Sequence, residues 1–440
     1  MYQSWVDATK IRQGTDEDIW AVDYTAHPLL DPDFAIKGSR LLYLTRLNFR
    51  RIVRDDTVYQ QELARIFQPQ VSGRPDDPSL PDLVARTGEY LREADIYLAS
   101  TIELLPSENR TAVLPLPLVT DCNDVRDLMG IAIHGEGERL RYEARRKLCL
   151  AQMLIQVDQS RIIQDGPAHK VHFEEVLNEG LWKHTKQIHD LNIGYRINKD
   201  GFNIDYTSRP VEGDQRWDFR STFVEKKSGR RSIGLDILYY NCRFKRSVTP
   251  ISFEIVDGSH RVLEQIRWGG MRQETSGSVL SKMIRKGINN PDEIGDIIGA
   301  MFIVNDNDAL TDLLVLLDSC VGTPFGWRNV TDTIGETPGG SSLNPFSSKD
   351  FKVFKGDVDV LTEEEGGGPA YRFPVEVQIY TLESYLRTVC GSHDASHLAL
   401  KLRQFLYGLV PKIFPRKIYG AEWLELDQKS NGQGAGKGRA

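Results

Sequence analysis

With 440 residues, a net charge of −7 and 27% charged residues, the chain has the composition of an ordinary globular protein with room for two or three domains. Its overall acidity argues against a surface built as a whole for nucleic-acid backbones, and its five scattered cysteines argue against a disulfide scaffold or a C-x2-C zinc site. No run approaches the roughly 20 apolar residues of a membrane helix. We therefore expect a cytoplasmic protein.

The N-terminal part of the sequence predicts helices. Residues 34–67 and 83–104 show helical apolar spacing, and a loop rich in proline, aspartate and glycine separates them. Residues 121–133 predict a turn followed by a buried strand, and residues 139–156 predict a basic helix. We expect residues 1–84 to form a mostly helical region with a packing role.

The middle of the chain predicts β-structure. Residues 190–206 favour a hairpin, and residues 235–244 a strand that pairs with 248–256. A long tract rich in glycine, proline and serine at 333–348 predicts a lid-like loop, and residues 363–369 predict a hairpin tip.

A basic amphipathic helix is expected just before Gly287, which ends it. Two i, i+4 apolar pairs form its buried stripe, namely Val279 with Met283 and Leu280 with Ile284. Ser278 and Lys282 lie on the more polar side, where several cations project together. Such a patch suits phosphates, although most charged helix faces are simply solvated.

Two predicted strands each carry a carboxylate. Asp296 precedes the apolar run 297–304, which predicts a buried strand. In residues 373–381 apolar and polar positions alternate, so Glu376 lies on the solvent- or site-facing side. An acid at a strand entrance is often only a cap, but two acids suffice for Mg²⁺ when substrate phosphates complete its shell. Together with the basic helix they predict a metal-dependent phosphoryl-transfer site.

These motifs resemble the synthetase domain of RelA/SpoT-type alarmone enzymes over roughly residues 268–405. The matching segments are Arg272-x5-Ser278-x3-Lys282, Asp296-Ile-Ile-Gly299 before a strand, and Val375-Glu376-Val-Gln378 within one. The resemblance implies an α/β (α+β) fold with a nucleotidyltransferase-like mixed sheet flanked by helices. It also implies transfer of a pyrophosphoryl group from ATP to the 3′-hydroxyl of a guanosine nucleotide, as in guanosine tetraphosphate synthesis.

The resemblance further implies a role for each matching residue. Arg272, Ser278 and Lys282 match contacts to the ATP phosphates. Asp296 matches the Mg²⁺ ligand, and Glu376 matches the carboxylate that activates the acceptor hydroxyl and helps to hold the metal. The remaining nucleotide contacts that it implies are Phe351, as a platform for the acceptor base, with Lys352, Lys355 and His397.

Several positions depart from the family pattern. The family's Arg-x-Lys is Arg272-Gln273-Glu274 here, a strand arginine is missing near Met301, a loop glycine and histidine become Asp350 and Lys355, and Gln-x-Arg-Thr ends in Tyr380-Thr381. Both carboxylates are retained while several phosphate and acceptor contacts are replaced. The acceptor therefore stays open between GDP, GTP and an RNA 3′ end, and the alternative is a catalytically inactive nucleotide-binding sensor or partner-binding module.

The aspartate-apolar-apolar-glycine order before a predicted strand occurs at Asp127 as well as at Asp296. A predicted strand that carries Glu254 follows the Asp127 motif, just as the strand that carries Glu376 follows the Asp296 motif. This repeated order predicts an internal duplication. The expected segments are a helical region at 1–84, a divergent copy or accessory α+β domain at 85–268, the synthetase-like domain at 269–426 and a disordered tail at 427–440.

Other enzyme classes lack a signal. The sequence contains no Walker-type glycine loop, H-E-x-x-H motif or dinucleotide fingerprint. The family's metal-dependent hydrolase domain uses paired His-Asp ligands, whereas the N-terminal half offers only His189-Asp190. We expect a Mg²⁺-dependent transferase that takes ATP and a nucleotide acceptor, without hydrolase activity.

Overall fold

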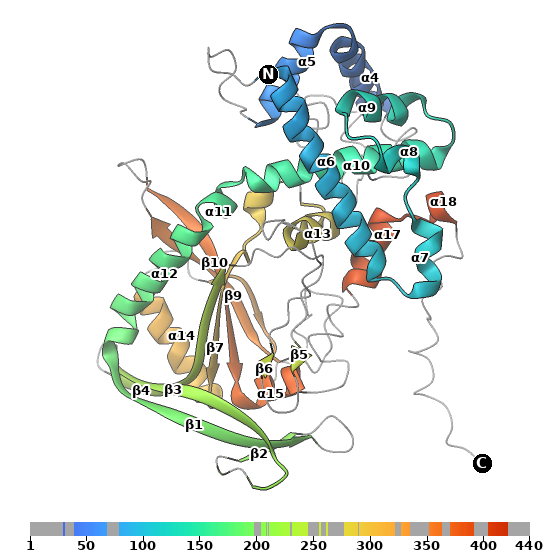
Figure 1. Ribbon diagram of the computed structural model, residues 1–440. Helices are drawn as coiled ribbons and strands as arrows, with labels where there is room; N and C mark the ends of the chain where they lie inside the picture. The colour runs from blue at the N-terminus through green and yellow to red at the C-terminus, as the bar shows by residue number, and fades with distance from the viewer. Residues whose placement is uncertain are drawn as a thin grey trace, which may run out of the picture. The chain divides into compact units, whose positions relative to one another are not determined.

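The computed structural model describes residues 30, 39–67, 79–197, 204–207, 209, 211–228, 231–244, 255–256, 261–262, 277–288, 290–321, 327–334, 352–362, 370–390 and 404–420. The chain divides into two compact units (Figure 1). The helical unit comprises residues 1–156, 280–289 and 406–440, and the sheet unit comprises residues 157–279 and 290–405.

The helical unit contains α-helices and one π-helical turn in its described part. The helices that lie wholly or mainly in it are α4 (Ser39–Arg54), α5 (Asp56–Phe67), α6 (Leu80–Glu103), α7 (Ser107–Val113), α8 (Pro117–Thr120), α9 (Val125–His134), α10 (Glu138–Asp158), α13 (Gly277–Lys286), η4 (Gln404–Leu409), α17 (Val410–Ile413) and α18 (Arg416–Tyr419). The predicted helices at 83–104 and 139–156 are confirmed as α6 and α10. The single helix predicted at 34–67 is two, because the Asp55 carboxylate accepts the backbone N–H of Thr57 at 2.8 Å and caps α5.

The strand predicted within residues 121–133 is wrong, since these residues form helix α9. Asp124 caps the helix by accepting the backbone N–H groups of Arg126 and Asp127 at 2.7 and 3.2 Å. The buried side chains recur at helical spacing, and they are Val125, Leu128, Met129, Ala132 and Ile133. The cap and the 3.6-residue period therefore override the short apolar run that suggested a strand.

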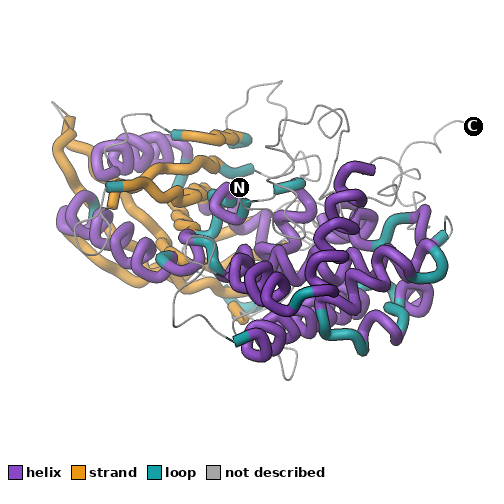
Figure 2. The backbone as a smooth tube through the Cα atoms, turned by 90° about the horizontal axis from the view of Figure 1, so that it is seen from above, coloured by secondary structure: helices purple, strands orange, loops and turns teal. Residues whose placement is uncertain are grey.

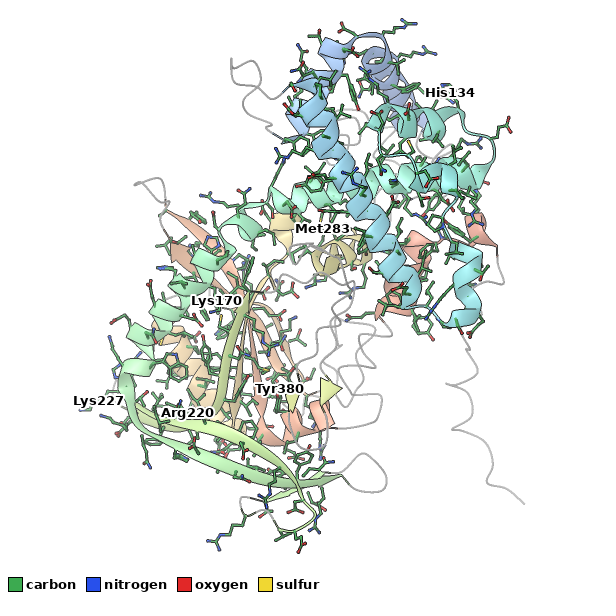
Figure 3. All side chains as sticks on the ribbon, in the orientation of Figure 1. His134, Lys170, Arg220, Lys227, Met283 and Tyr380 are labelled. Carbon is green, nitrogen blue, oxygen red and sulfur yellow. The ribbon has the colours of Figure 1, made fainter. Side chains whose placement is uncertain are left out.

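Helix α13 has the predicted buried stripe. Val279, Leu280, Met283 (labelled in Figure 3) and Ile284 are each at most 2% exposed. Gly287 ends the helix with φ of 71°, and the N–H of Ile288 bonds back to the carbonyl of Met283 at 2.9 Å, as in a left-handed C-terminal cap. Within the helical unit, the Ser281 hydroxyl lies 2.7 Å from the Tyr97 hydroxyl of α6, which ties the helix to its neighbour.

The sheet unit contains the described strands and four α-helices. Its elements are α11 (Arg161–Gln164), α12 (Gly166–Gly180), η2 (Trp182–His184), β1 (Thr185–Ile197), β2 (Ile204–Thr207), β3 (Gln215–Ser228), β4 (Arg231–Phe244), β5 (Ile255–Val256), β6 (Arg261–Val262), η3 (Pro291–Glu293), β7 (Ile298–Val304), α14 (Asn307–Val321), β8 (Arg328–Asp332), β9 (Phe354–Thr362), β10 (Tyr371–Thr381) and α15 (Leu382–Cys390). Eight strands form one mixed sheet in the order β2-β1-β3-β4-β7-β10-β9-β8, with β7 and β10 parallel and the other pairs antiparallel. This confirms the predicted mixed sheet flanked by helices.

One face of the sheet is a dry apolar core. Helices α12 and α14 pack against each other and across the central strands, as Figures 1 and 2 show. Alternate residues of β7 and β10 point into this core, among them Phe302, Val375 and Val377, each at most 1% exposed. The opposite face of the same strands consequently carries the polar residues of β10.

The pairing of the sheet corrects the predicted duplication. Strand β4 comes from the first expected copy and β7 from the second, yet the two are hydrogen-bonded neighbours in one sheet. Strand β4 also pairs with β3 through residues 231–237, while most of its predicted partner at 248–256 lies outside the described residues and residues 255–256 pair with 261–262. With α9 in place of the first predicted strand, the described strands do not divide into two tandem sheets, because each half supplies four strands of the eight-stranded sheet.

Other predictions have clear outcomes. The hairpin at 190–206 is confirmed as the antiparallel pair β1–β2. The predicted tip at 363–369 and most of the loop at 333–348 lie outside the described residues, as does the tail at 427–440. Over the described part, four cysteines carry free thiols, and they are Cys122, Cys149, Cys242 and Cys320. No helix there is long and apolar enough to cross a bilayer.

Candidate active site on the polar face of the sheet

The polar face of β9 and β10 gathers charged and amide side chains in two neighbouring rows. Glu376 of β10 lies in register between Asp357 of β9 and Gly299 of β7. In the next row, Gln378 lies between Lys355 and Met301. Cross-strand partners share one face of a sheet, so the acids and the lysine project together from the side opposite α12 and α14.

Glu376 is the best-defined residue of this group. It lies on the face that the sequence predicted, but it is only 2% exposed and is therefore buried, not solvent-facing. Its Oε1 accepts a hydrogen bond of 2.5 Å from Nε2 of Gln378, and its Oε2 is paired with the ammonium of Lys355. A buried carboxylate needs such partners, because an unpaired charge away from water is strongly destabilising.

Gln378 is itself held in place. The Tyr380 hydroxyl donates to its side-chain carbonyl at 3.3 Å, and the Tyr380 ring packs edge-on against Tyr385 of α15 (Tyr380 is labelled in Figure 3). Because its carbonyl is occupied, the Gln378 amide is oriented with its NH₂ group toward Glu376. The hydrogen bond from Gln378 to Glu376 thus belongs to a chain of side chains that hold one another in place. Lys355, by contrast, reaches Glu376 on a flexible side chain.

Asp357 is a candidate site residue that the motif comparison missed. It lies directly across from Glu376, is 7% exposed, and accepts a hydrogen bond of 2.7 Å from the Asn329 side-chain amide. Asn329 adopts a left-handed backbone conformation with φ of 49°, which asparagine tolerates better than most residues. A Cβ on Gly295 would come within 3.0 Å of Oδ2 of Asp357, so glycine is needed for this close approach.

The electrostatics of Asp357 indicate a crowded set of acids. Burial is the largest cause of a raised pKa for its carboxyl, which the hydrogen bond from Asn329 partly offsets. The carboxylates of Glu376 and Asp296 also raise this pKa, while Lys355 lowers it. Asp296, which is partly buried just before β7, therefore lies within electrostatic reach of Asp357. The structure thus brings the two predicted acids into one neighbourhood with a third.

The predicted phosphate contacts are distributed differently. Lys355 pairs with Glu376, and Lys352 is exposed just before β9. Lys282 is a partly exposed residue of α13 in the helical unit, so it belongs to a different unit from the acids. The side chain of Ser278 and the whole of Arg272, Phe351 and His397 lie outside the described residues.

The acids fit a small divalent cation only in part. Carboxylate oxygens are the ligands that Mg²⁺ prefers, and mutual repulsion among buried acids is relieved by a cation. Across the described ranges, however, no group of three or more histidine, cysteine, aspartate or glutamate residues has the arrangement of a metal cage. Two carboxylates alone would need substrate phosphates and water to complete the coordination shell of a bound Mg²⁺.

Comparisons with known proteins find likeness to part of the chain only. No protein-family model and no curated protein matches the sequence. Among solved structures, small alarmone synthetase 1 from Bacillus subtilis bound to its product pppGpp is 22% identical over 25% of this chain and 52% of its own, with a TM-score of 0.20. Small alarmone synthetase 2 from the same organism is 15% identical over 34% and 58%, with a TM-score of 0.22. A GTP pyrophosphokinase family protein from Streptococcus pneumoniae is 17% identical over 34% and 55%, also with a TM-score of 0.22.

The chain thus spans little more than half the length of these solved proteins. With TM-scores this low, the description of the fold rests on the sheet itself and not on these likenesses.

Proposed function

We propose that the chain is a RelA/SpoT-like, Mg²⁺-dependent transferase that moves a pyrophosphoryl or nucleotidyl group from ATP to a hydroxyl of a nucleotide or of RNA. The observation that supports this most is the buried Glu376 facing Asp357 across the β9–β10 pair, with Asp296 near and Lys355 in contact. A purely structural face would have little reason to bury two acids side by side.

Glu376 is the proposed general base. It takes the proton of the acceptor hydroxyl, and the low exposure of its site limits competition from water. The attacking oxygen forms a bond to the β-phosphorus of ATP while the bond from that phosphorus to the α–β bridging oxygen breaks. AMP leaves with the electron pair, so the acceptor gains two phosphates.

Asp296 and one of the two buried acids would hold the metal, and Lys355 would contact a phosphate. When bound, Mg²⁺ neutralises charge on the phosphates and orients them. Asn329 and Gly295 would then act as positioning residues, since they fix the Asp357 carboxylate and leave room for it. Lys282 and Ser278, with Arg272, remain proposed ATP-phosphate contacts on the strength of the sequence resemblance alone.

The test is an acceptor panel. The full chain is incubated with Mg²⁺, one acceptor at a time (GDP, GTP, other nucleotides or RNA), and ATP labelled either on the γ-phosphate, which follows a pyrophosphoryl group, or on the α-phosphate, which follows a nucleotidyl group. We expect label to move to at least one acceptor, and transfer to GDP or GTP would identify alarmone-type synthesis. Retained ATP binding without turnover on any acceptor would instead favour the catalytically inactive sensor.

A further inference from the structure

Both oxygens of the proposed base are occupied in the structure described here. Gln378 donates to Oε1 and the Lys355 ammonium pairs with Oε2, so a metal or a hydroxyl proton that approaches Oε2 must compete with Lys355. The two partners differ in freedom. Gln378 is tied to Tyr380, whereas the Lys355 side chain is 39% exposed and reaches the buried acid from the solvent side.

We infer that Lys355 is a latch that blocks Glu376 until a nucleotide phosphate draws its ammonium group away. This inference rests on the proposed function and concerns the regulation of the same site. In the latched state the charge of Glu376 is neutralised by the ammonium group of Lys355. This ammonium group competes with Mg²⁺ for the same carboxylate oxygen. A phosphate near the site offers Lys355 an alternative anionic partner, and the released carboxylate then becomes available to the metal and the acceptor.

The charge balance of the site supports this exchange. Lys355 is the cation whose contact with Glu376 is seen directly, and its charge also lowers the pKa of Asp357. Removing that cation leaves Glu376 and Asp357 facing each other across the two strands without it, which raises the affinity of this pair for a divalent ion. A lysine is suited to such a role, because its ammonium is a point charge on a flexible stem and not a fork fixed to one partner.

Lys355→Met separates the latch from a simpler role, because it shifts two affinities in opposite directions. We expect isothermal titration with Mg²⁺ alone to show about tenfold tighter binding in the variant, since the competing ammonium is gone. Titration with ATP in EDTA should show about tenfold weaker binding, since a phosphate partner is lost. Lys183→Met is the matched control, because Lys183 forms an exposed pair with Glu179 at 3.3 Å, and it should change neither affinity.

Glu376→Gln provides a second test with the opposite sign for ATP. In this variant Lys355 loses its ion pair with Glu376, so metal-free ATP should bind more tightly than to the wild type. The latch is refuted if Lys355→Met weakens or leaves unchanged the binding of Mg²⁺, or if Glu376→Gln fails to tighten that of ATP. These titrations need no turnover, so a chain without transferase activity that still showed both shifts would retain the latch and lose only the proposed reaction.

Discussion

Two buried lysine–carboxylate pairs, one in each unit, have opposite architectures. In the helical unit the cation is the buried partner: Lys147 is fully buried and its ammonium lies 2.6 Å from Asp95, whose side chain is 22% exposed. In the sheet unit the acid is buried: Glu376 is 3% exposed by side chain and Lys355 39%. A lysine can exchange one anionic partner for another only where its ammonium group is exposed enough to move. The two ion pairs are therefore suited to different roles.

The surroundings of each lysine strengthen this contrast. Lys147 also donates to the backbone carbonyls of Val119, Thr120 and Cys122 and to the Asn123 side chain, at 2.8 to 3.2 Å. It thereby binds backbone carbonyls at the C-terminal end of α8, where a helix leaves its last carbonyls without intrahelical partners. Lys355 has one described ion-pair partner and a stem in contact with solvent. Lys147 is therefore suited to a fixed structural role, and Lys355 to one in which its side chain moves.

The largest expected effect is on the structural pair. Lys147→Met leaves the Asp95 carboxylate and several carbonyls without their cation, so we expect the free energy of unfolding to fall by about 3–5 kcal/mol. Urea denaturation followed by circular dichroism measures this loss. Lys170→Met, which removes one member of the more exposed Lys170–Glu174 pair of α12, should cost at most about 1 kcal/mol. Equal losses in the two variants would contradict the contrast.

The proposed catalytic pair should show the reverse pattern. Glu376→Gln removes the proposed base but lets Lys355 return to water, so we expect transfer to fall about 10²-fold or more while the unfolding free energy changes by about 1 kcal/mol at most. Glu383→Gln, an exposed acid of α15 paired with Arg387 at 2.6 Å, is the control and should retain full turnover. Wild-type rates from Glu376→Gln would remove that residue from the mechanism.

A smaller effect is expected at the residue that positions Asp357. Asn329→Ala deletes the amide that donates to the buried carboxylate, which should destabilise the fold by about 1–2 kcal/mol. Differential scanning calorimetry gives the shift. Asn329→Gly removes the same bond while easing the backbone at positive φ, so it should cost less than alanine. A larger loss of stability in the glycine variant than in the alanine variant would contradict this explanation.

The smallest effect concerns pH. The folded-state pKa of Asp357 is raised, chiefly by burial, so the folded chain holds this proton more tightly than the unfolded chain does. Stability therefore falls as pH rises from about 4, the usual aspartate pKa, through the raised value. Asp357→Asn should be less sensitive to pH in that window, as measured by urea midpoints in metal-free buffer. An unaltered slope would mean that the carboxyl titrates normally.

The sequence was most informative where one period ran through a whole element. Val279 and Met283 predicted the buried stripe of α13, and the alternation around Glu376 predicted the face of β10. The same reasoning failed at residues 121–133, where an apolar run outweighed a cap at Asp124 and an equally clear helical spacing. A single clear apolar period thus predicts an element well. Where an apolar run and a helix cap compete, as at residues 121–133, the period alone does not decide between strand and helix.

Two acids of the candidate site could be named from the sequence, but their contacts could not. Asp296 and Glu376 followed from the motif, yet Asp357 emerges only from the register of β9 against β10. A signal for it existed, since a hairpin tip at 363–369 places residues near 357 opposite Glu376. The burial of Glu376 and its pairing with Lys355 depend on how the sheet packs, which no local pattern encodes.

The most direct test of the central claim, that the acids on the polar face of the sheet carry out pyrophosphoryl transfer, is the identity of the products. The account predicts that wild-type protein incubated with ATP, Mg²⁺ and an accepted hydroxyl substrate releases one AMP for each acceptor that gains two phosphates, as resolved by ³¹P NMR, and that Glu376→Gln releases almost none. Release of ADP or of pyrophosphate in place of AMP would exclude this chemistry. Equal AMP release by the wild type and Glu376→Gln would place the reaction elsewhere in the molecule.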